Sequence, residues 1–248
     1  MFEVLFYQPI LNLLVFLYNI IPGHDIGVVI IVLTIILKLV LWPLSQQSLK
    51  SQKALQTLQP KIEELKKKYA DKKDELGKAM MLLYKENKVN PLSSCLPLLI
   101  QMPFLFAVFR VFSNGLSNGS LDLVYPFITK PEMINTISFG FINLAERSIP
   151  FAILAGLAQF WQSKMLISKR PEIKTPEAKD EDMASIMNKQ MTYFMPIMTV
   201  FIGLSFPGGL SLYWLVTTLL TGLQQKYIFS KKDKNKITNN VIEGEVIK

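Results

Sequence analysis

The stretch IGVVIIVLTIILKLVLWPL, from Ile26 to Leu44, determines the class of this protein. It carries a single charge, at Lys38, and as a helix it is long enough to cross the hydrocarbon core of a bilayer. Hydrophobic residues make up 50% of the chain and the mean hydropathy is +0.29, which favours a membrane protein over a water-soluble one. Four later stretches are also long and mostly apolar, and we expect each to span the membrane: 92–112, 149–167, 191–206 and 210–227. The expected fold class is all-α, a polytopic membrane protein with five transmembrane helices.

The positive charges outside these spans indicate how the chain crosses the membrane. Most of the 27 Lys and Arg lie in three polar stretches, with eleven in 45–91, five in 168–190 and five in 228–248. The remaining connecting segments hold few or none: 1–25, 113–148 and 207–209. Because cytoplasmic segments of membrane proteins are enriched in Lys and Arg, we expect the three basic stretches in the cytoplasm and the N-terminus outside. The net charge of +8 then reflects topology, and no specific nucleic acid is expected as a ligand.

The connecting segments have expected structures of their own. Residues 9–20 should form an amphipathic helix on the outer membrane surface, although an extra span is the alternative. In 45–91, apolar residues recur every three or four positions on both sides of a turn at 70–73, which predicts a helical hairpin. This hairpin either has a function of its own or only connects two spans, and the sequence gives the two interpretations equal weight. We expect turns and short helices in 113–148, a tight turn at 207–209 and a disordered tail over 228–248.

Lys38 is the most informative single residue, because a charge that faces lipid at the centre of a span costs at least ~2.5–3.5 kcal/mol. One interpretation is snorkelling, in which the side chain reaches the cytoplasmic interface near Ser45, about 10 Å away at 1.5 Å rise per residue. In the other, Lys38 faces a hydrated cavity inside the protein, on the same side as Thr34 one helical turn earlier. These residues alone give the two interpretations equal weight.

Other polar side chains inside the expected spans favour the cavity: Gln101, Gln159, Gln162, Thr199, Thr217, Thr218 and Thr221. Amides and hydroxyls in hydrocarbon need partners, so these residues either line one cavity or hold helices together by hydrogen bonds. The single Cys95 and the single His24 can form neither a disulfide nor a thiol metal cluster. The spans show no nucleophile with a base and no Gly-rich phosphate loop, so we expect no enzyme, no cofactor and no metal.

Four motifs, in chain order, resemble those of one protein family. The most specific is NPLSSCLPLLIQMPF, residues 90–104. The others are Gln8-Pro9, Leu58-Gln59-Pro60 before a Lys-rich helix, and FPGGL at 206–210 leading into LYW at 212–214. Together they cover roughly residues 8–228 and are similar to the YidC family of membrane protein insertases. The resemblance is to a short bacterial form with five transmembrane helices and no large extracytoplasmic domain.

This resemblance implies a mechanism and site residues. A hydrophilic groove, open to cytoplasm and lipid but closed outside, would receive the polar tail of an incoming protein while its apolar segment slides along the third and fifth spans. In the family the groove centres on an arginine, and Lys38 stands at the matching position. Lysine lacks the guanidinium fork and loses its proton more readily when desolvated, so attraction of acidic tails is expected to be weaker or more pH-sensitive. Gln162 and Trp214 match polar and aromatic groove positions.

The expected function is insertion of nascent membrane proteins with short or acidic translocated tails into the lipid bilayer of the bacterial plasma membrane. The ribosome and the Sec translocon are the expected partners, and the expected groove residues are Lys38, Gln162, Trp214, Gln101, Thr34 and Gln159. One alternative is a small-solute or ion transporter that uses Lys38, for which a pore open to both faces or internal repeat symmetry would be diagnostic. Another is a structural scaffold for the Sec complex, which would tolerate Lys38→Leu.

Overall fold

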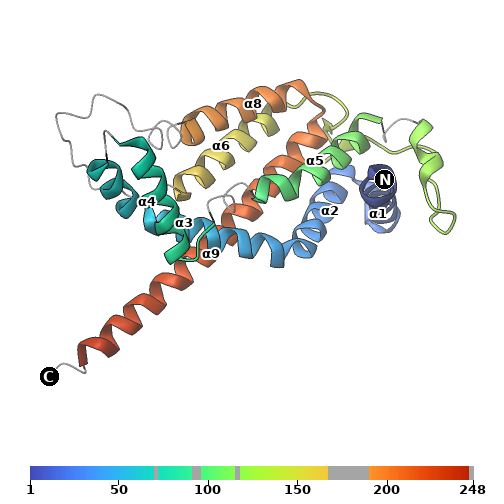
Figure 1. The fold of residues 1–248 in the computed structure, drawn as a ribbon. Helices are drawn as coiled ribbons and strands as arrows, with labels where there is room; N and C mark the ends of the chain where they lie inside the picture. Colours follow the sequence, from blue (N-terminus) through green and yellow to red (C-terminus); the bar gives the residue numbers. More distant parts are fainter. Residues whose placement is uncertain (70–71, 91–95, 115–117, 167–189, 246–248) are drawn as a thin grey trace. The chain divides into compact units, whose positions relative to one another are not determined.

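The computed structural model describes residues 1–69, 72–90, 96–114, 118–166 and 190–245 (Figure 1). Within these residues the regular secondary structure is helical apart from one antiparallel pair of two-residue strands, so the fold class is all-α. The elements in chain order are η1 (Glu3–Tyr7), α1 (Gln8–Ile20), η2 (Pro22–His24), α2 (Ile26–Val40), α3 (Trp42–Lys68), α4 (Lys73–Glu86), α5 (Leu96–Asn114), η4 (Asn118–Leu123), β1 (Ile137–Ser138), β2 (Ile142–Asn143), α6 (Ile149–Leu166), η5 (Gln190–Phe194), α8 (Met195–Ser205) and α9 (Gly208–Glu245).

The described residues form two compact units, and each is described by itself. The first contains α1, α2, α5 from Leu98, the loop of residues 118–148, α6 as far as Lys164, α8, and α9 as far as Thr221. The second contains α3, α4 and α9 from Gly222 onward. Cys95, the expected beginning of the second span at residue 92, the turn at 70–71 and nearly all of 168–190 lie outside the described residues.

The hydrophobic core of the first unit is built from helix faces that repeat every three or four residues. Its most deeply buried members come from α1, α2 and α5: Leu11, Leu14, Val15, Val29, Ile30, Leu33, Ala107, Val108 and Val111. Leu210, Leu212 and Tyr213 add the first turns of α9. The opposite face of α1 is also apolar, with Phe16 and Ile20 about half exposed. A helix that is apolar on both faces is typical of a membrane environment.

The N-terminus of α2 is fixed by Asp25, which is its N-cap residue. The Asp25 carboxylate accepts hydrogen bonds from the backbone N–H groups of Gly27 at 2.8 Å and Val28 at 3.2 Å, which are free donors in the first turn of a helix. The same carboxylate accepts the Ser138 hydroxyl and, at 2.6 Å, the backbone N–H of Phe139. One side chain therefore begins α2 and binds the β1–β2 hairpin to it.

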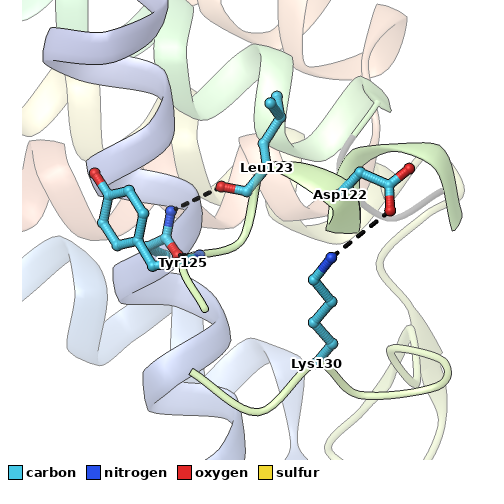
Figure 2. Close-up of polar contacts among 5 residues, drawn as sticks. Asp122, Leu123, Tyr125 and Lys130 are labelled. Carbon is cyan, nitrogen blue, oxygen red and sulfur yellow. Dashed lines mark hydrogen bonds and ion pairs between the residues drawn. The ribbon is translucent and has the colours of Figure 1, made fainter. Parts of the chain in front are cut away.

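Side chains of α1 hold the 118–148 loop through its backbone. The Asn12 carboxamide accepts the backbone N–H of Tyr125 at 2.7 Å and donates to the carbonyl of Leu123 at 3.2 Å. Figure 2 labels these two loop residues, Leu123 and Tyr125. Further along α1, the Tyr18 hydroxyl and the Asn19 amide bond the loop backbone at Asn135 and Thr129. Figure 2 also shows the exposed ion pair between Asp122 and Lys130, whose charged atoms are 3.7 Å apart. The loop thus lies along α1 with its backbone polar groups bonded.

Two glycines allow the start of α9 to pack tightly against this loop. Gly208 and Gly209 lie in the first turn of α9, and their N–H groups donate to the carbonyls of Glu146 at 2.7 Å and Leu144 at 3.0 Å. A Cβ atom on Gly208 would lie 2.9 Å from the Cβ of Ser148. The sequence predicts that these glycines form a turn at 207–209, but the structure uses them for close helix–loop contact, and only Phe206 and Pro207 separate α8 from α9.

The second unit contains the two helices predicted by the periodicity of residues 45–91. Helices α3 and α4 contact each other. In the same unit, α9 is bonded to α3: the Lys53 ammonium donates to the Phe229 carbonyl at 2.5 Å and lies over the Phe229 ring. Gln224 and Ser45 exchange side-chain hydrogen bonds of 3.0–3.2 Å.

In three places the structure differs from what the sequence predicts. The sequence predicts a disordered tail from 228, whereas α9 continues to Glu245. The apolar stretch that ends at Leu44 is not one helix: α2 stops at Val40 and α3 begins at Trp42, since Pro43 lacks the N–H that would continue the α2 hydrogen bonds. Residues 113–148 contain a short strand pair as well as the expected turns and short helix, because strands of two residues are too short to show an alternating pattern.

The number of membrane spans is not decided by helix length. Among the described residues, one helix, Glu3–Ile20, is long and apolar enough to cross a membrane by itself. Helices α2 and α3 qualify when they are counted together, whereas Gln101–Ser113 and Thr192–Ser205 are apolar but shorter. The five-span topology therefore stays a prediction.

Candidate functional site

Lys38 projects from the last turn of α2 toward polar side chains of two other helices. Its ammonium donates a hydrogen bond to the Thr221 hydroxyl of α9 at 2.8 Å and contacts the amide oxygen of Gln101 of α5 at 3.5 Å. The side chain is half-buried. Thr221 in turn donates to the carbonyl of Thr217, which leaves an oxygen lone pair of Thr221 directed at the lysine.

The pocket around Lys38 is formed by helices α2, α5 and α9. Its lining residues are Thr34, Leu37, Lys38, Leu41, Gln101, Phe104, Tyr213 and Thr217. None of these described residues is acidic, so the positive charge meets only neutral oxygen atoms there. The side chains around Lys38 pack closely and leave little free space between them.

Tyr213 completes the polar cluster. Gln101 donates its amide N–H to the Tyr213 hydroxyl. Because the nitrogen end of this amide is bonded to Tyr213, the oxygen end faces Lys38. Thr34 is fully buried beside them, and its hydroxyl donates to the Ile30 carbonyl of its own helix at 2.6 Å.

Trp214 lies in a different pocket from Lys38. It lines a space between α6, α8 and α9 with Ala155, Thr199, Ile202, Gly203, Phe206, Leu210 and Ser211. Helix geometry explains the separation, because neighbouring residues of an α-helix point about 100° apart. Tyr213, Thr217 and Thr221 are spaced four residues apart and share the face of α9 toward Lys38, whereas Trp214 is one position off this face.

Gln159 and Gln162, the other two expected groove residues, belong to α6 and are half-buried. Neither lines the Lys38 pocket or the Trp214 pocket. The structure thus brings Lys38, Thr34 and Gln101 together and leaves Gln159, Gln162 and Trp214 apart from them.

Sequence reasoning gave no role to two residues that the structure places in polar contacts. Tyr213 could have been found from its four-residue spacing to Thr217 and Thr221. Arg110 of α5 lies inside an expected span, and its guanidinium is 3.7 Å from the Glu3 carboxylate and stacks over the Tyr7 ring. Arg110 could have been found from Glu3, because this negative charge in the apolar N-terminal stretch needs a positively charged partner. Among the described residues, no three His, Cys, Asp or Glu side chains gather as metal ligands would.

Comparison with known proteins identifies the family. The chain matches the family described as 60Kd inner membrane protein over residues 16–236. It is 36% identical over 225 residues to the membrane protein insertase YidC of Geobacter metallireducens, an alignment that covers 89% of this chain and 36% of that relative. For the proteins of the same name from Syntrophus aciditrophicus and Pelobacter propionicus, the identities are 37% over 224 residues and 36% over 236 residues. Those alignments cover 89% and 94% of this chain, and 36% and 39% of the relatives.

The chain therefore belongs to the YidC family of inner membrane proteins. It spans little more than a third of the length of these relatives. The shared name of the relatives gives no support to the transporter alternative.

Proposed function

We propose that this protein is a membrane protein insertase and chaperone that works without enzymatic turnover. In this proposal the Lys38 ammonium attracts the acidic, translocated tail of a nascent membrane protein into the pocket between α2, α5 and α9. The apolar segment of the client then moves into lipid, and its burial there drives the reaction. The observation that carries the proposal is a lysine charge inside a helix cluster, whose hydrogen-bond partners among the described residues, Thr221 and Gln101, are neutral.

Electrostatics favour a carboxylate as the client group that replaces these partners. Two opposite charges 4 Å apart attract by ~1 kcal/mol in water but ~4 kcal/mol at the effective dielectric constant of about 20 that suits partly buried sites. A carboxylate can therefore displace Thr221 and Gln101 from Lys38. Because the side chains around Lys38 leave little free space, the tail would displace some of them as it enters.

The proposed topology has five spans, with the N-terminus outside and the C-terminus in the cytoplasm. The distribution of Lys and Arg supports it. In this topology α1 lies on the outer membrane surface instead of crossing the bilayer. The contacts of α1 support this placement, because Asn12, Tyr18 and Asn19 all bond the polar backbone of the 118–148 loop along two turns of the helix. The inner membrane location is that of the family.

The proposed partners follow from the same scheme. Clients are nascent membrane proteins with short or acidic translocated tails, delivered by ribosomes directly or through the Sec translocon. The two helices α3 and α4, which carry ten Lys with their connecting residues, would receive clients on the cytoplasmic side. We propose that Gln159, Gln162 and Trp214 contact the client later, outside the Lys38 pocket.

A charge-swap experiment tests this proposal. Lys38→Glu should abolish insertion of a client with an acidic translocated tail, because the pocket would then repel the tail. The same variant should insert a client whose tail carries lysines in place of the acids. Lys38→Arg should retain insertion, since it keeps the positive charge.

Lys226→Glu is the matched control, because it makes the same charge change at an exposed lysine of α9. Each variant is reconstituted into vesicles, and tail translocation is scored by protection from added protease. Normal insertion of the acidic client by Lys38→Glu would refute the electrostatic role. A Sec scaffold is indicated instead if Lys38→Leu loses no activity in the same assay.

A further inference from the structure

Three residues, Phe139, Gly140 and Phe141, connect β1 to β2 and place two aromatic side chains at the tip of the hairpin. The backbone N–H of Phe141 donates to the carbonyl of Ser138 at 3.2 Å, and Phe139 and Gly140 are the two residues between them. Both have positive φ angles, 54° and 81°, which define a type I′ turn. This turn type strongly prefers Asn-Gly or Gly-Gly, because left-handed backbone is unfavourable for residues with a large side chain.

Phe139 therefore occupies a position where a small residue would be less strained. A left-handed conformation is unfavourable for a residue other than glycine, because its Cβ atom crowds the following carbonyl oxygen. The hydrogen bond from the Phe139 N–H to the Asp25 carboxylate at 2.6 Å holds the backbone in this conformation. The Phe139 ring lies against Gly27, where a Cβ atom would be 2.9 Å from the ring.

These contacts fix the depth of the hairpin relative to the membrane. Asp25 immediately precedes α2, and in the proposed topology Ile26 is the first residue of the first span on the outer side. The hairpin tip is bonded to Asp25 itself and packs on Gly27. It must therefore lie where the span enters the bilayer, at the level of the lipid headgroups. Aromatic side chains are enriched at that level in membrane proteins.

The most exposed large side chains of the hairpin and its loop are apolar, although Ile137 is paired across the strands with Asn143. Ser138 points to Asp25 and is fully buried, so its neighbour Ile137 points to the opposite face, where it is 49% exposed. Phe141, just after the turn, is 80% exposed. A water-facing hairpin would place polar residues at these positions.

We propose that the β1–β2 hairpin is an interfacial anchor that inserts Phe141 and Ile137 into the headgroup region of the outer leaflet. The bound partner is the lipid bilayer, and the anchor holds the start of α2 at a fixed depth through Asp25. This inference rests on the proposed topology but not on the insertion of clients.

Fluorescent labelling at single cysteines tests the anchor. In a Cys95→Ala background, Phe141→Cys or Ile137→Cys is labelled with a polarity-sensitive dye, and the full chain is reconstituted into phosphatidylcholine vesicles. The vesicles carry nitroxide lipids with the quencher either near the headgroup or at the end of the acyl chain. Two reference positions bracket the result: Lys67→Cys, exposed on α3, and Phe201→Cys, exposed on α8 within a proposed span.

The expected emission at positions 141 and 137 is shifted to shorter wavelength than at position 67, and the headgroup nitroxide quenches it severalfold more than the deep nitroxide. Emission and quenching equal to those at position 67 would overturn the proposal, as would the deep quenching expected at position 201. A membrane-impermeant quencher distinguishes this failure from a wrong topology. In the proposed topology positions 141 and 67 lie on opposite sides of the membrane, so a quencher that reaches both from one side shows that the topology is wrong. The readout needs no client, so loss of insertase activity leaves it unchanged.

Discussion

Removal of the Asp25 carboxylate should destabilise the first unit more than removal of any other single exposed or half-buried carboxylate. Asp25→Ala removes the N-cap of α2, which contributes about 1 kcal/mol in typical helices. It also removes the acceptor for two hydrogen bonds from the β1–β2 hairpin, those of Ser138 and Phe139. Hydrogen bonds to charged groups contribute roughly 1.5–3 kcal/mol each when buried, and less where solvent reaches them as it does here.

The expected loss for Asp25→Ala is therefore about 2–4 kcal/mol of unfolding free energy. Asp25→Asn should lose less, because its remaining oxygen still accepts from Gly27 and Val28 while its amide nitrogen cannot accept from Phe139. The assay is chemical unfolding in detergent micelles, followed by circular dichroism.

Asp122→Ala is the matched control for this prediction. Asp122 lies in the same loop, is largely exposed, and pairs only with Lys130 at 3.7 Å (Figure 2). Exposed ion pairs contribute about 0–1 kcal/mol, so this variant should unfold almost as the parent does. Equal unfolding free energies for Asp25→Ala and Asp122→Ala would refute the account of Asp25 as the joint between α2 and the hairpin.

Three further predictions follow from the same geometry. Burial raises the pKa of Asp25, but hydrogen bonds from Ser138, Phe139, Val28 and Gly27 outweigh it and lower that pKa below its ordinary 3.8. The stability from Asp25 is therefore complete above about pH 4–5 and lost as the pH falls below about 4; unfolding measured against pH should show this loss in the parent and not in Asp25→Asn. Gly208→Ala should cost about 1–3 kcal/mol, since its Cβ would meet Ser148, whereas Gly77→Ala should gain about 0.5–1 kcal/mol in α4, where nothing lies within 4 Å; a gain in both unfolding experiments would contradict the tight contact at Gly208. Thr221→Val should lower the unfolding free energy by about 1.5–3 kcal/mol, because Lys38 loses its nearer acceptor, yet insertion of an acidic client should persist; lost insertion at unchanged stability would instead make Thr221 part of the client site.

The sequence predicts the helical fold well where apolar stretches are long. The start of α2 at Ile26 is found from the sequence because a polar run, Pro22 to Asp25, precedes an unbroken apolar one. The end of that helix is misplaced because hydropathy does not register that Pro43 lacks an N–H. The β1–β2 hairpin is missed because its two-residue strands are held by a side chain of another element, Asp25, and not by their own periodicity.

The candidate site is predicted in part, for a similar reason. Lys38 stands out because a charge in an apolar span needs a partner, and Thr34 and Gln101 follow from the same rule. Trp214 is assigned to the groove by resemblance, yet the direction of a side chain on α9 depends on its position around the helix. Spacing by four residues selects Tyr213, Thr217 and Thr221 for the face toward Lys38, and it separates Trp214 from them.

The most direct test of the central claim is site-specific crosslinking to a client arrested during insertion. A photoreactive residue replaces Leu37, which lines the Lys38 pocket, or Leu39, which is two positions along α2 and 62% exposed. Mass spectrometry then identifies which part of the client is attached to each position. The account predicts that position 37 captures the acidic tail of the client and that position 39 does not, and that Lys38→Glu removes the crosslink at 37. Capture of the tail at 39 alone, or at 37 regardless of the charge at 38, would contradict it.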